Sequence, residues 1–265
     1  MTSPSKPDAA KSTCSIRLLP PEQRVAAAQR AIEINPSNAP GAHNPMIAFA
    51  PFGPEQLAVL VKKYWGKQGV ELTVGFLDAA SQELRARILS HMNAWNTEAN
   101  ANVRFVPTDT DPQVRIAFTP GGGYWSYLGT DILSISAGQP TMNLDSFSMT
   151  TPDSEFHRVV RHETGHTLGF PHEHTRTEIV NNIDREKAIA YFMADQGWSR
   201  DQVIAQVLTP LDSSALIATA AADPESIMCY WLPAAIMKDN KPVVGGTDID
   251  PTDAQFAASV YPKGA

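Results

Sequence analysis

Thirteen residues, HETGHTLGFPHEH from position 162 to 174, constrain this chain more than any other stretch, because they hold four of its seven histidines. His162 and His166 are four residues apart, so on a helix both imidazoles lie on one face. Gly169 stands where such a helix would need a left-handed residue to end, and the turn it allows would bring His172 back toward the other two. The spacing therefore predicts a metal site made by one helix and the loop that follows it.

The number and type of these ligands indicate the chemistry of the site. Three imidazoles leave the fourth position of a tetrahedral zinc ion open, which is typical of catalytic sites, whereas structural sites have four protein ligands. Glu163 lies beside the first ligand and could accept a proton from a water molecule whose pKa the ion lowers toward about 7. The residues thus predict Zn²⁺ as cofactor and hydrolysis of a peptide bond. A solvated polar stretch is the simpler alternative, but the extended H-E-x-x-H-x-x-G-x-x-H pattern fixes two more positions than the short motif.

Periodicity elsewhere predicts strands around one helix in the first half of the chain and helices in the second half. The first of these helices has an apolar face with spacings of four, four and three, formed by Leu84, Ile88, Met92 and Trp95. Strands are expected at 72–77, 103–106, 114–118, 132–136 and 140–144, and a glycine-opened loop at 121–129. Further helices are expected at 21–34, 153–168, 183–194, 199–208 and 251–261. The expected fold class is α+β with a twisted sheet.

Composition excludes several classes of protein. The chain has 265 residues, enough for one large domain or two modest lobes. Its net charge of −7 and its lack of a basic cluster argue against nucleic acid as a partner. It has no run of about 18 apolar residues, so we expect no membrane span. The first residues lack the apolar core of a secretory signal, so we expect a cytosolic chain, one exported by another route, or one numbered after a signal was removed.

The motif and a second element resemble a known group of enzymes. The extended histidine motif is similar to the signature of metzincin zinc metallopeptidases, and SIMCY (226–230) resembles their methionine turn. Together with GFPHEHTR (169–176), the S-x-M-x-Y form resembles the astacin family, and weaker similarities occur at 124–129, 184–192 and 250–262. Astacins usually carry paired disulfides, whereas this chain has only Cys229 in the matching region. The resemblance therefore indicates a divergent, astacin-like branch.

The resemblance implies a two-lobed zincin, with a twisted mixed sheet, a backing helix and an active-site helix, and a mostly irregular or helical C-terminal lobe. The catalytic domain would span 56–265, with lobes at about 60–169 and 170–262, and residues 1–55 would be an N-terminal extension with a proline-rich linker. The resemblance to this family favours an extracellular location. The resemblance implies that the metal ligands are His162, His166, His172 and, as a fifth, Tyr230. It implies two catalytic groups, Glu163 as general base and Tyr230 as oxyanion donor. Three residues would support the site: Met228 under the metal, Gly169 at the turn, and Glu173 as partner of the mature N-terminus.

Protein or peptide substrates are expected to bind extended and antiparallel to an edge strand at Pro140–Leu144, because this stretch resembles the rim strand of the family. We expect a monomer. Two alternatives use the same scaffold: a zinc amidase that acts on non-peptide substrates, and a catalytically silent binding protein. Retention of Glu163 and all three histidines argues against the silent protein.

Residues 1–55 lie outside the resemblance and could be a removable inhibitory segment, a packed extension or a tail. Cys14 could donate a thiolate to zinc, as in the latent forms of other metzincins, could bridge to Cys229, or could stay unpaired. The apolar residues of SIRLL (15–19) and the helical pattern at 21–34 predict that the segment packs on the catalytic domain. The five prolines of 35–54 predict an extended path across its surface.

Overall fold

The computed structural model describes residues 14–42, 53, 60–210 and 221–264. Its central element is one mixed sheet of six strands in the order β1-β5-β6-β4-β2-β3, in which only β5 and β6 pair antiparallel. The strands are β1 (Cys14–Arg17), β2 (Val70–Phe76), β3 (Val103–Pro107), β4 (Val114–Ala117), β5 (Tyr124–Tyr127) and β6 (Met142–Asn143). A mixed sheet with helices confirms the predicted α+β class.

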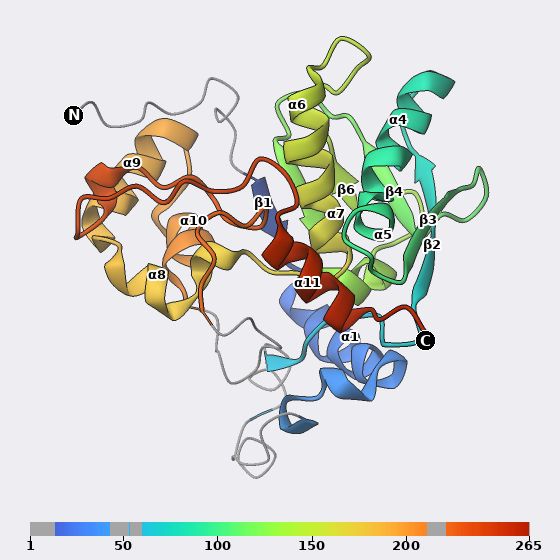
Figure 1. Ribbon diagram of the computed structural model, residues 1–265, viewed down its shortest axis with the longest axis horizontal. Coiled ribbons are helices and arrows are strands. Elements are labelled where there is room, and N and C mark those ends of the chain that lie inside the picture. The colour runs from blue at the N-terminus through green and yellow to red at the C-terminus, as the bar shows by residue number, and fades with distance from the viewer. Residues whose placement is uncertain (1–13, 43–52, 54–59, 211–220, 265) are drawn as a thin grey trace.

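Two helical units pack with this sheet, and the sequence predicted both. One is α4 (Gln82–Met92) with α5 (Ala94–Thr97), whose apolar face of Leu84, Ile88, Met92 and Trp95 is buried as expected. The other is a continuous helix made by α6 (Asp153–Glu155), a π-helical turn η5 (Phe156–Val160) and α7 (Arg161–Thr167). This second helix carries the histidine motif. Together with the sheet, these helices form the sheet lobe, which lies on the right in Figure 1.

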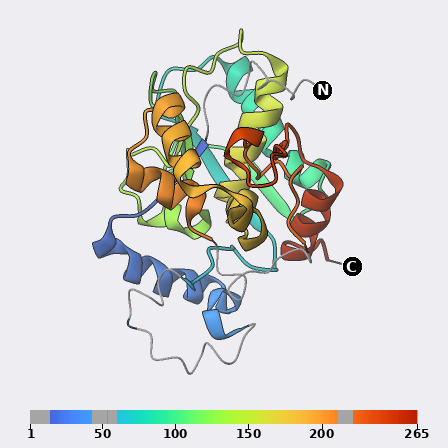
Figure 2. The same ribbon diagram turned by 90° about the vertical axis from the view of Figure 1, so that its left-hand side faces the viewer.

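The second lobe is built from short helices, α8 (Thr177–Asn182), α9 (Arg185–Gln196), α10 (Arg200–Val203) and a π-helical turn η7 (Ile204–Leu208). They lie on the left in Figure 1 and in front of the sheet in Figure 2. We call this the helical lobe. The closing helix α11 (Pro251–Val260) returns to the sheet lobe, where Ala257 and Val260 join the larger core. β1 lies between the two lobes.

The described part of the N-terminal segment packs on the rest of the chain, as predicted. β1 adds a parallel strand to β5, and α1 (Pro21–Ile34) begins and ends where the sequence predicted. The Arg30 guanidinium donates to the carbonyl of Leu133 (2.9 Å) and fixes α1 to the sheet lobe. The extended path expected for 35–54 is wrong at its start, because 36–38 and 40–42 form 3₁₀ turns. Residues 43–52 and 54 lie outside the described residues.

Three local predictions were wrong, and each error concerns the sheet. The expected loop at 121–129 contains β5, and the expected strand at 132–136 is largely a 3₁₀ helix, η4 (Gly129–Ser134). Pro140–Leu144 is not an edge strand, because β6 pairs with β4 on one side and β5 on the other. Local propensity does not decide these assignments, since pairing partners far away in sequence do. The strands that border the cleft are β5, through Tyr124, and β1, through Cys14 and Ile16.

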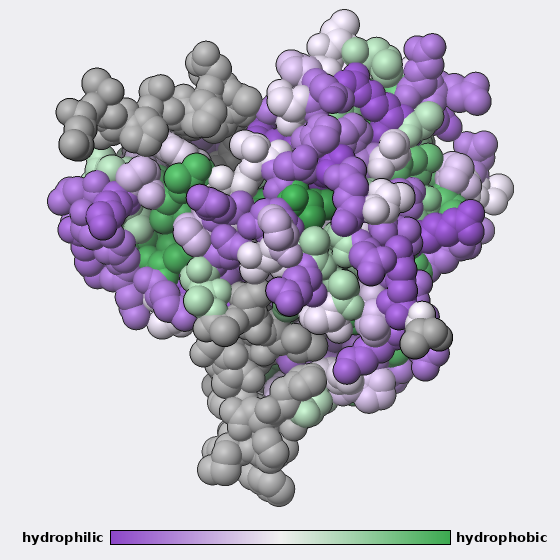
Figure 3. All heavy atoms as spheres, in the orientation of Figure 1, coloured by the Kyte–Doolittle hydropathy of each residue, from purple (hydrophilic) through white to green (hydrophobic). Residues whose placement is uncertain are grey.

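Two surface properties bear on partners. Within the described residues, no helix has the length and apolar character needed to cross a bilayer. The face in Figure 3 is mostly hydrophilic, and its apolar residues form several separate patches.

Candidate metal centre

The first two candidate ligands project from α7. The ring centroids of His162 and His166 lie 4.7 Å apart. In each ring Nδ1 faces a main-chain carbonyl oxygen, that of Ile227 for His162 (2.6 Å) and that of Phe170 for His166 (2.7 Å). Because a carbonyl only accepts hydrogen bonds, Nδ1 carries the proton of each neutral ring. Both Nε2 atoms therefore keep a lone pair for a metal, with their orientation fixed from behind.

The turn after α7 brings the third candidate ligand to the same place. Gly169 has φ of +95°, a conformation that side chains rarely tolerate, and its N–H donates to the carbonyl of His166 (2.8 Å). The chain then reverses, and His172 Nε2 lies 3.0 Å from His166 Nε2 and 3.4 Å from His162 Nε2. The structure thus brings together the three histidines that the spacing pointed to.

Burial keeps these three rings neutral. It lowers the pKa of His162 to about 4 and moves the pKa values of His166 and His172 well below the usual value. Neighbouring imidazoles contribute in the same direction at His166 and His172. Neutral imidazole is the form that ligates zinc, so the donor set fits that ion.

Glu163 is fully buried beside the three rings. Neither of its carboxylate oxygens accepts a geometrically sound hydrogen bond from the described residues. Burial raises its pKa to about 8, and the Cys14 thiol and the Arg158 guanidinium nearby act in the opposite direction. A buried carboxylate without a donor costs free energy unless a further group satisfies it. Its position fits a water molecule held at the metal site.

Cys14 reaches the same site from the N-terminal segment. Its sulfur and one ring nitrogen of each of the three histidines all lie within 4.8 Å of one another. The Cys14–Cys229 bridge, one of the alternatives from the sequence, is not formed, because both cysteines are free and buried. Burial raises the pKa of the Cys14 thiol well above its usual value, and the Glu163 carboxylate adds to this. Three nitrogens and one sulfur make a complete donor set for tetrahedral zinc.

Tyr230 lies beside the three histidines, and its implied roles as fifth ligand and oxyanion donor stay predictions. Its ring centroid is 4.3 Å from that of His172 and 4.0 Å from that of His174, with which it stacks. Its hydroxyl donates to the main-chain carbonyl of Cys14. Burial raises the pKa of the phenol well above its usual value, so the hydroxyl remains a donor.

Met228 and Glu173 connect the two lobes beneath the site. The Met228 side chain packs so closely on α7 that a Cβ at Gly165 would lie 2.5 Å from its sulfur. The N–H of Glu173 donates to the carbonyl of Met228 (2.9 Å), and its carboxylate accepts the N–H of Asp223 (3.0 Å). Burial raises the pKa of Glu173 to about 7. Met228 therefore supports the ligand helix from below, and Glu173 ties the loop after it.

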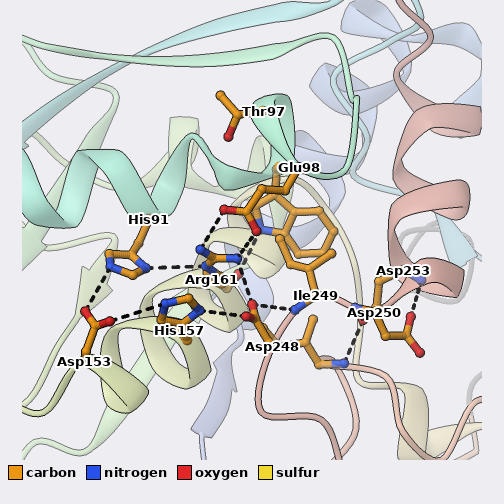
Figure 4. A network of polar contacts seen from close by, with 12 residues as sticks. His91, Thr97, Glu98, Asp153, His157, Arg161, Asp248, Ile249, Asp250 and Asp253 are labelled. Carbon is orange, nitrogen blue, oxygen red and sulfur yellow. Dashed lines mark hydrogen bonds and ion pairs between the residues drawn. The ribbon is translucent and has the colours of Figure 1, made fainter.

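A buried arginine holds the ligand helix from the other side (Figure 4). Arg161 Nη1 lies 2.5 Å from a carboxylate oxygen of Glu98 and 2.8 Å from one of Asp248, and its side chain is 5% exposed. The other oxygen of Asp248 lies 2.7 Å from His157 Nδ1. These contacts join α7 to the end of α5 and to the segment before α11, and so fix the residue that precedes His162.

His91, Asp153 and His157 form a second group with the chemistry of metal ligands. The Nε of Arg161 donates to Nδ1 of His91 (3.4 Å), so the neutral ring carries its proton on Nε2, which faces Asp153 at 3.8 Å. That nitrogen has no lone pair to offer a metal. The hydrogen bonds of this group therefore favour a structural role.

The cleft extends on both sides of the three histidines. Tyr124, Arg158 and Trp231 are among the residues that line one side. Tyr64 and Gln206 are among those that line the other, together with Ile16 of β1. The sequence offered no signal for Gln206, because its side chain reaches the site through the packing of η7. The YWSYLG similarity did mark β5, although a loop was predicted there.

Comparisons with known proteins agree with this geometry. The family model described as Astacin, a peptidase family, matches residues 59–231. A solved structure of myroilysin is similar, with 33% sequence identity and a TM-score of 0.70, over 77% of this chain and 97% of that chain. A crystal structure of myroilysin has 34% identity and a TM-score of 0.57, over 76% of this chain and 86% of the other.

Proposed function

The chain belongs to the astacin family of zinc metalloendopeptidases, and from this premise we propose that it cleaves peptide bonds with Glu163 as general base. His162, His166 and His172 would hold the zinc ion. The observation that carries this assignment is the convergence of three Nε2 atoms beside a buried carboxylate for which the described residues provide no hydrogen bond of standard geometry. The catalytic domain would span 56–265.

The mechanism uses groups that the structure places together. A zinc ion bound by the three histidines would supply Lewis-acid activation of the attacking water and of the scissile carbonyl. Glu163 would take a proton from the water as it attacks and deliver it to the leaving amine. Glu163 lies buried beside the three rings, and a surrounding of low polarity helps the carboxyl to hold this proton between the two steps.

Tyr230 would stabilise the negative charge that develops on the carbonyl oxygen. Its hydroxyl already donates to one peptide carbonyl next to the ligands, that of Cys14. A substrate in place of β1 would present its own carbonyl to the same donor. Oxyanion donors of this kind contribute about 10²–10³ in rate.

The full chain would be a latent form of the enzyme. Cys14 would supply a fourth protein ligand, which closes a tetrahedral site against water and substrate. β1 also occupies the edge of β5 along which an extended substrate would bind. β1 runs parallel to β5, whereas a substrate bound antiparallel to that strand would run in the opposite direction.

The function is tested with full-length protein that carries Cys14→Ser. We expect about one zinc ion per chain and cleavage of internally quenched peptides. Glu163→Gln in this background should keep the zinc and lower kcat by about 10³-fold, within the range for loss of a general base. His166→Gln should lower the zinc content. Full activity of the Glu163→Gln variant, or activity without zinc, would contradict the mechanism.

Latency is tested by comparing two single substitutions. Cys14→Ser should raise the peptidase activity of the full chain, because the hydroxyl is a poor zinc ligand. Cys229→Ser is the matched control, since it changes the other buried cysteine, and it should leave the chain latent. Equal activity of the wild-type and Cys14→Ser proteins would exclude the thiol as the blocking group.

A further inference from the structure

β1 is held along both of its edges. One edge pairs with β5, where Ile16 lies opposite Ser126. The other edge faces the side-chain amide of Gln206, whose Oε1 accepts the N–H of Ile16 (3.3 Å) and whose Nε2 donates to the carbonyl of Ile16 (3.1 Å). One side chain thus forms the two hydrogen bonds that a neighbouring strand would form.

Gln206 is connected to the metal centre through the fourth histidine of the motif. The carbonyl of Gln206 accepts a hydrogen bond from Nε2 of His174 (2.9 Å). His174 is fully buried. Its ring stacks on Tyr230 at 4.0 Å. His174, which has no place among the three candidate zinc ligands, therefore fixes the position of Gln206 relative to them.

Gln206 and Tyr230 act on the same edge of the bound strand. In extended backbone, alternate residues direct their N–H and C=O groups to the same side. The carbonyl of Cys14 faces Tyr230, and two residues later both polar groups of Ile16 face Gln206. A strand in this position thus lies in a slot between β5 and a row formed by Tyr230 and Gln206.

This slot accepts a strand of either direction. A primary amide has a donor on one side and an acceptor on the other. A rotation of 180° about the Cγ–Cδ bond exchanges the two, so the amide can pair with the N–H and C=O of a residue in a parallel or an antiparallel strand. The contacts that hold β1 can therefore hold a chain that runs the opposite way along β5.

We infer that Gln206 binds the backbone of the peptide substrate on the amino-terminal side of the cleaved bond. A substrate antiparallel to β5 passes Ser126 before it reaches Tyr124, the residue opposite Cys14. The residue bound by Gln206 is therefore about two positions before the one next to the metal. This inference rests on the proposed peptidase function, and it makes Gln206 a substrate-binding residue that ignores side-chain identity.

The test removes single N–H groups from the substrate. Peptides are prepared in which one residue at a time before the scissile bond is a hydroxy acid, so that an ester replaces the amide and its N–H is lost. Full-length Cys14→Ser protein should prefer the amide to the ester by about 5-fold at the position that faces Gln206, the effect of one hydrogen bond. β1 competes with both peptides for the same slot. Because the ratio compares two peptides with one enzyme, this competition affects both values equally and cancels.

Variants of Gln206 then test whether its side chain is the hydrogen-bond partner of that substrate N–H. In Gln206→Ala the amide-to-ester ratio at that position should fall to about 1, whereas Gln206→Glu, which keeps an acceptor, should retain the preference. The matched control is Gln68→Ala, an exposed glutamine that lines neither side of the cleft, which should keep the ratio of the parent. An unchanged ratio in Gln206→Ala would overturn the inference, and so would loss of the ratio in Gln68→Ala.

A binding measurement separates this inference from the proposed function. The double variant Cys14→Ser, Glu163→Gln is titrated with the same labelled peptides, and Kd values replace kinetic constants. One outcome is that the Cys14→Ser protein cleaves nothing, while the double variant binds peptides with an amide-to-ester ratio of Kd values that depends on Gln206. This outcome would overturn the peptidase function and support the slot. Cleavage without a ratio that depends on Gln206 would overturn the slot alone. A chain that neither binds nor cleaves peptides would overturn both.

Discussion

The sheet lobe has one large core that extends from β2 to α11, whereas the helical lobe has a smaller core of short helices and loops. The sheet lobe holds His162, Glu163 and His166 on one continuous helix. The helical lobe contributes Tyr230 and Gln206 from a turn and a π-helical segment. Only isolated bridges, such as Leu232 with Val243, give the described part of the helical lobe any strand pairing.

The difference indicates where the site is rigid and where it can adjust. Side chains on a helix are fixed by many backbone hydrogen bonds and a packed face, so His162, Glu163 and His166 should move little on their own. Loop residues are fixed by a few individual contacts, such as the bond from Glu173 N–H to Met228 O. Elements with few such contacts open at lower free energy. We expect release of β1 and binding of substrate to change the helical lobe more than the sheet lobe.

The largest effects should come from emptying the two cores. Trp95→Ala in the sheet lobe should lower the free energy of unfolding by about 4 kcal/mol, because it leaves a large cavity and removes the hydrogen bond from the indole to the carbonyl of Arg161 (2.9 Å). Phe192→Ala in the helical lobe should cost about 3 kcal/mol. Hydrogen exchange should show early opening of 177–208 only for Phe192→Ala.

Met193→Ala is the control for Phe192→Ala, since the neighbouring methionine is 46% exposed and should contribute less than about 0.5 kcal/mol. If Trp95→Ala and Phe192→Ala expose the same amides to exchange, the two lobes unfold as one unit and the contrast between them is wrong.

A smaller effect is expected at the junction of the lobes. Gly165→Ala would place a Cβ 2.5 Å from the sulfur of Met228 and 3.2 Å from the Trp95 ring. We expect a loss of about 2 kcal/mol, typical of overpacking, measured by denaturant unfolding of the zinc-loaded protein. Met228→Ala in the same chain should recover part of that loss, because it removes the clashing atoms. Additive effects of the two substitutions would show that the contact is not shared.

The pH dependence of stability tests the sheet lobe alone. Burial, and then the charge of Arg161, lowers the pKa of His91 to about 4, and its side chain is 11% exposed. The folded state therefore binds fewer protons here than the unfolded state, whose histidine titrates near 6.5. This contribution is present above pH 6.5 and is lost as the pH falls toward 4. Between pH 7.5 and 4.5, wild type should lose about 1.5 kcal/mol more than His91→Gln. If the free energy of unfolding falls equally with pH in the two proteins, His91 does not have a lowered pKa.

The smallest effect concerns a lysine that borders the cleft between the lobes. Lys62 is buried, its ammonium has no hydrogen-bond partner among the described residues, and burial lowers its pKa to about 8. The charged ammonium is therefore less favourable in the folded state than in the unfolded state. The free energy of unfolding should rise as the pH increases from 8 toward 10.5, because the unfolded state binds more protons in this range. Lys62→Met should raise the free energy of unfolding at pH 7 by about 1 kcal/mol, whereas Lys67→Met, at an exposed site, should not change it. A destabilised Lys62→Met protein would show that the ammonium has a favourable partner.

Much of the fold followed from local pattern. The α1 bounds and the buried face of Leu84, Ile88, Met92 and Trp95 were predicted, because apolar periodicity over three turns reflects which side of a helix is buried. The errors at 121–129 and 132–136 have a different origin. An apolar run of five residues suits a strand or a short helix equally, and the presence of a pairing partner decides between them. Here β1 and β6 selected 124–127 as the strand.

The sequence by itself determined the three histidines, Glu163 and the glycine turn, because a four-residue helical spacing and one left-handed residue are settled within eleven positions of chain. The sequence also suggested the Cys14 thiolate as a zinc ligand, as one of several possible roles for that residue. Only the tertiary structure decided that Cys14 reaches the histidines, that β1 pairs with β5 beside them, and that Gln206 completes the slot. Those arrangements rest on backbone hydrogen bonds between distant segments. Since nearly every residue has the same backbone donor and acceptor, side-chain identity does not reveal which strands will pair.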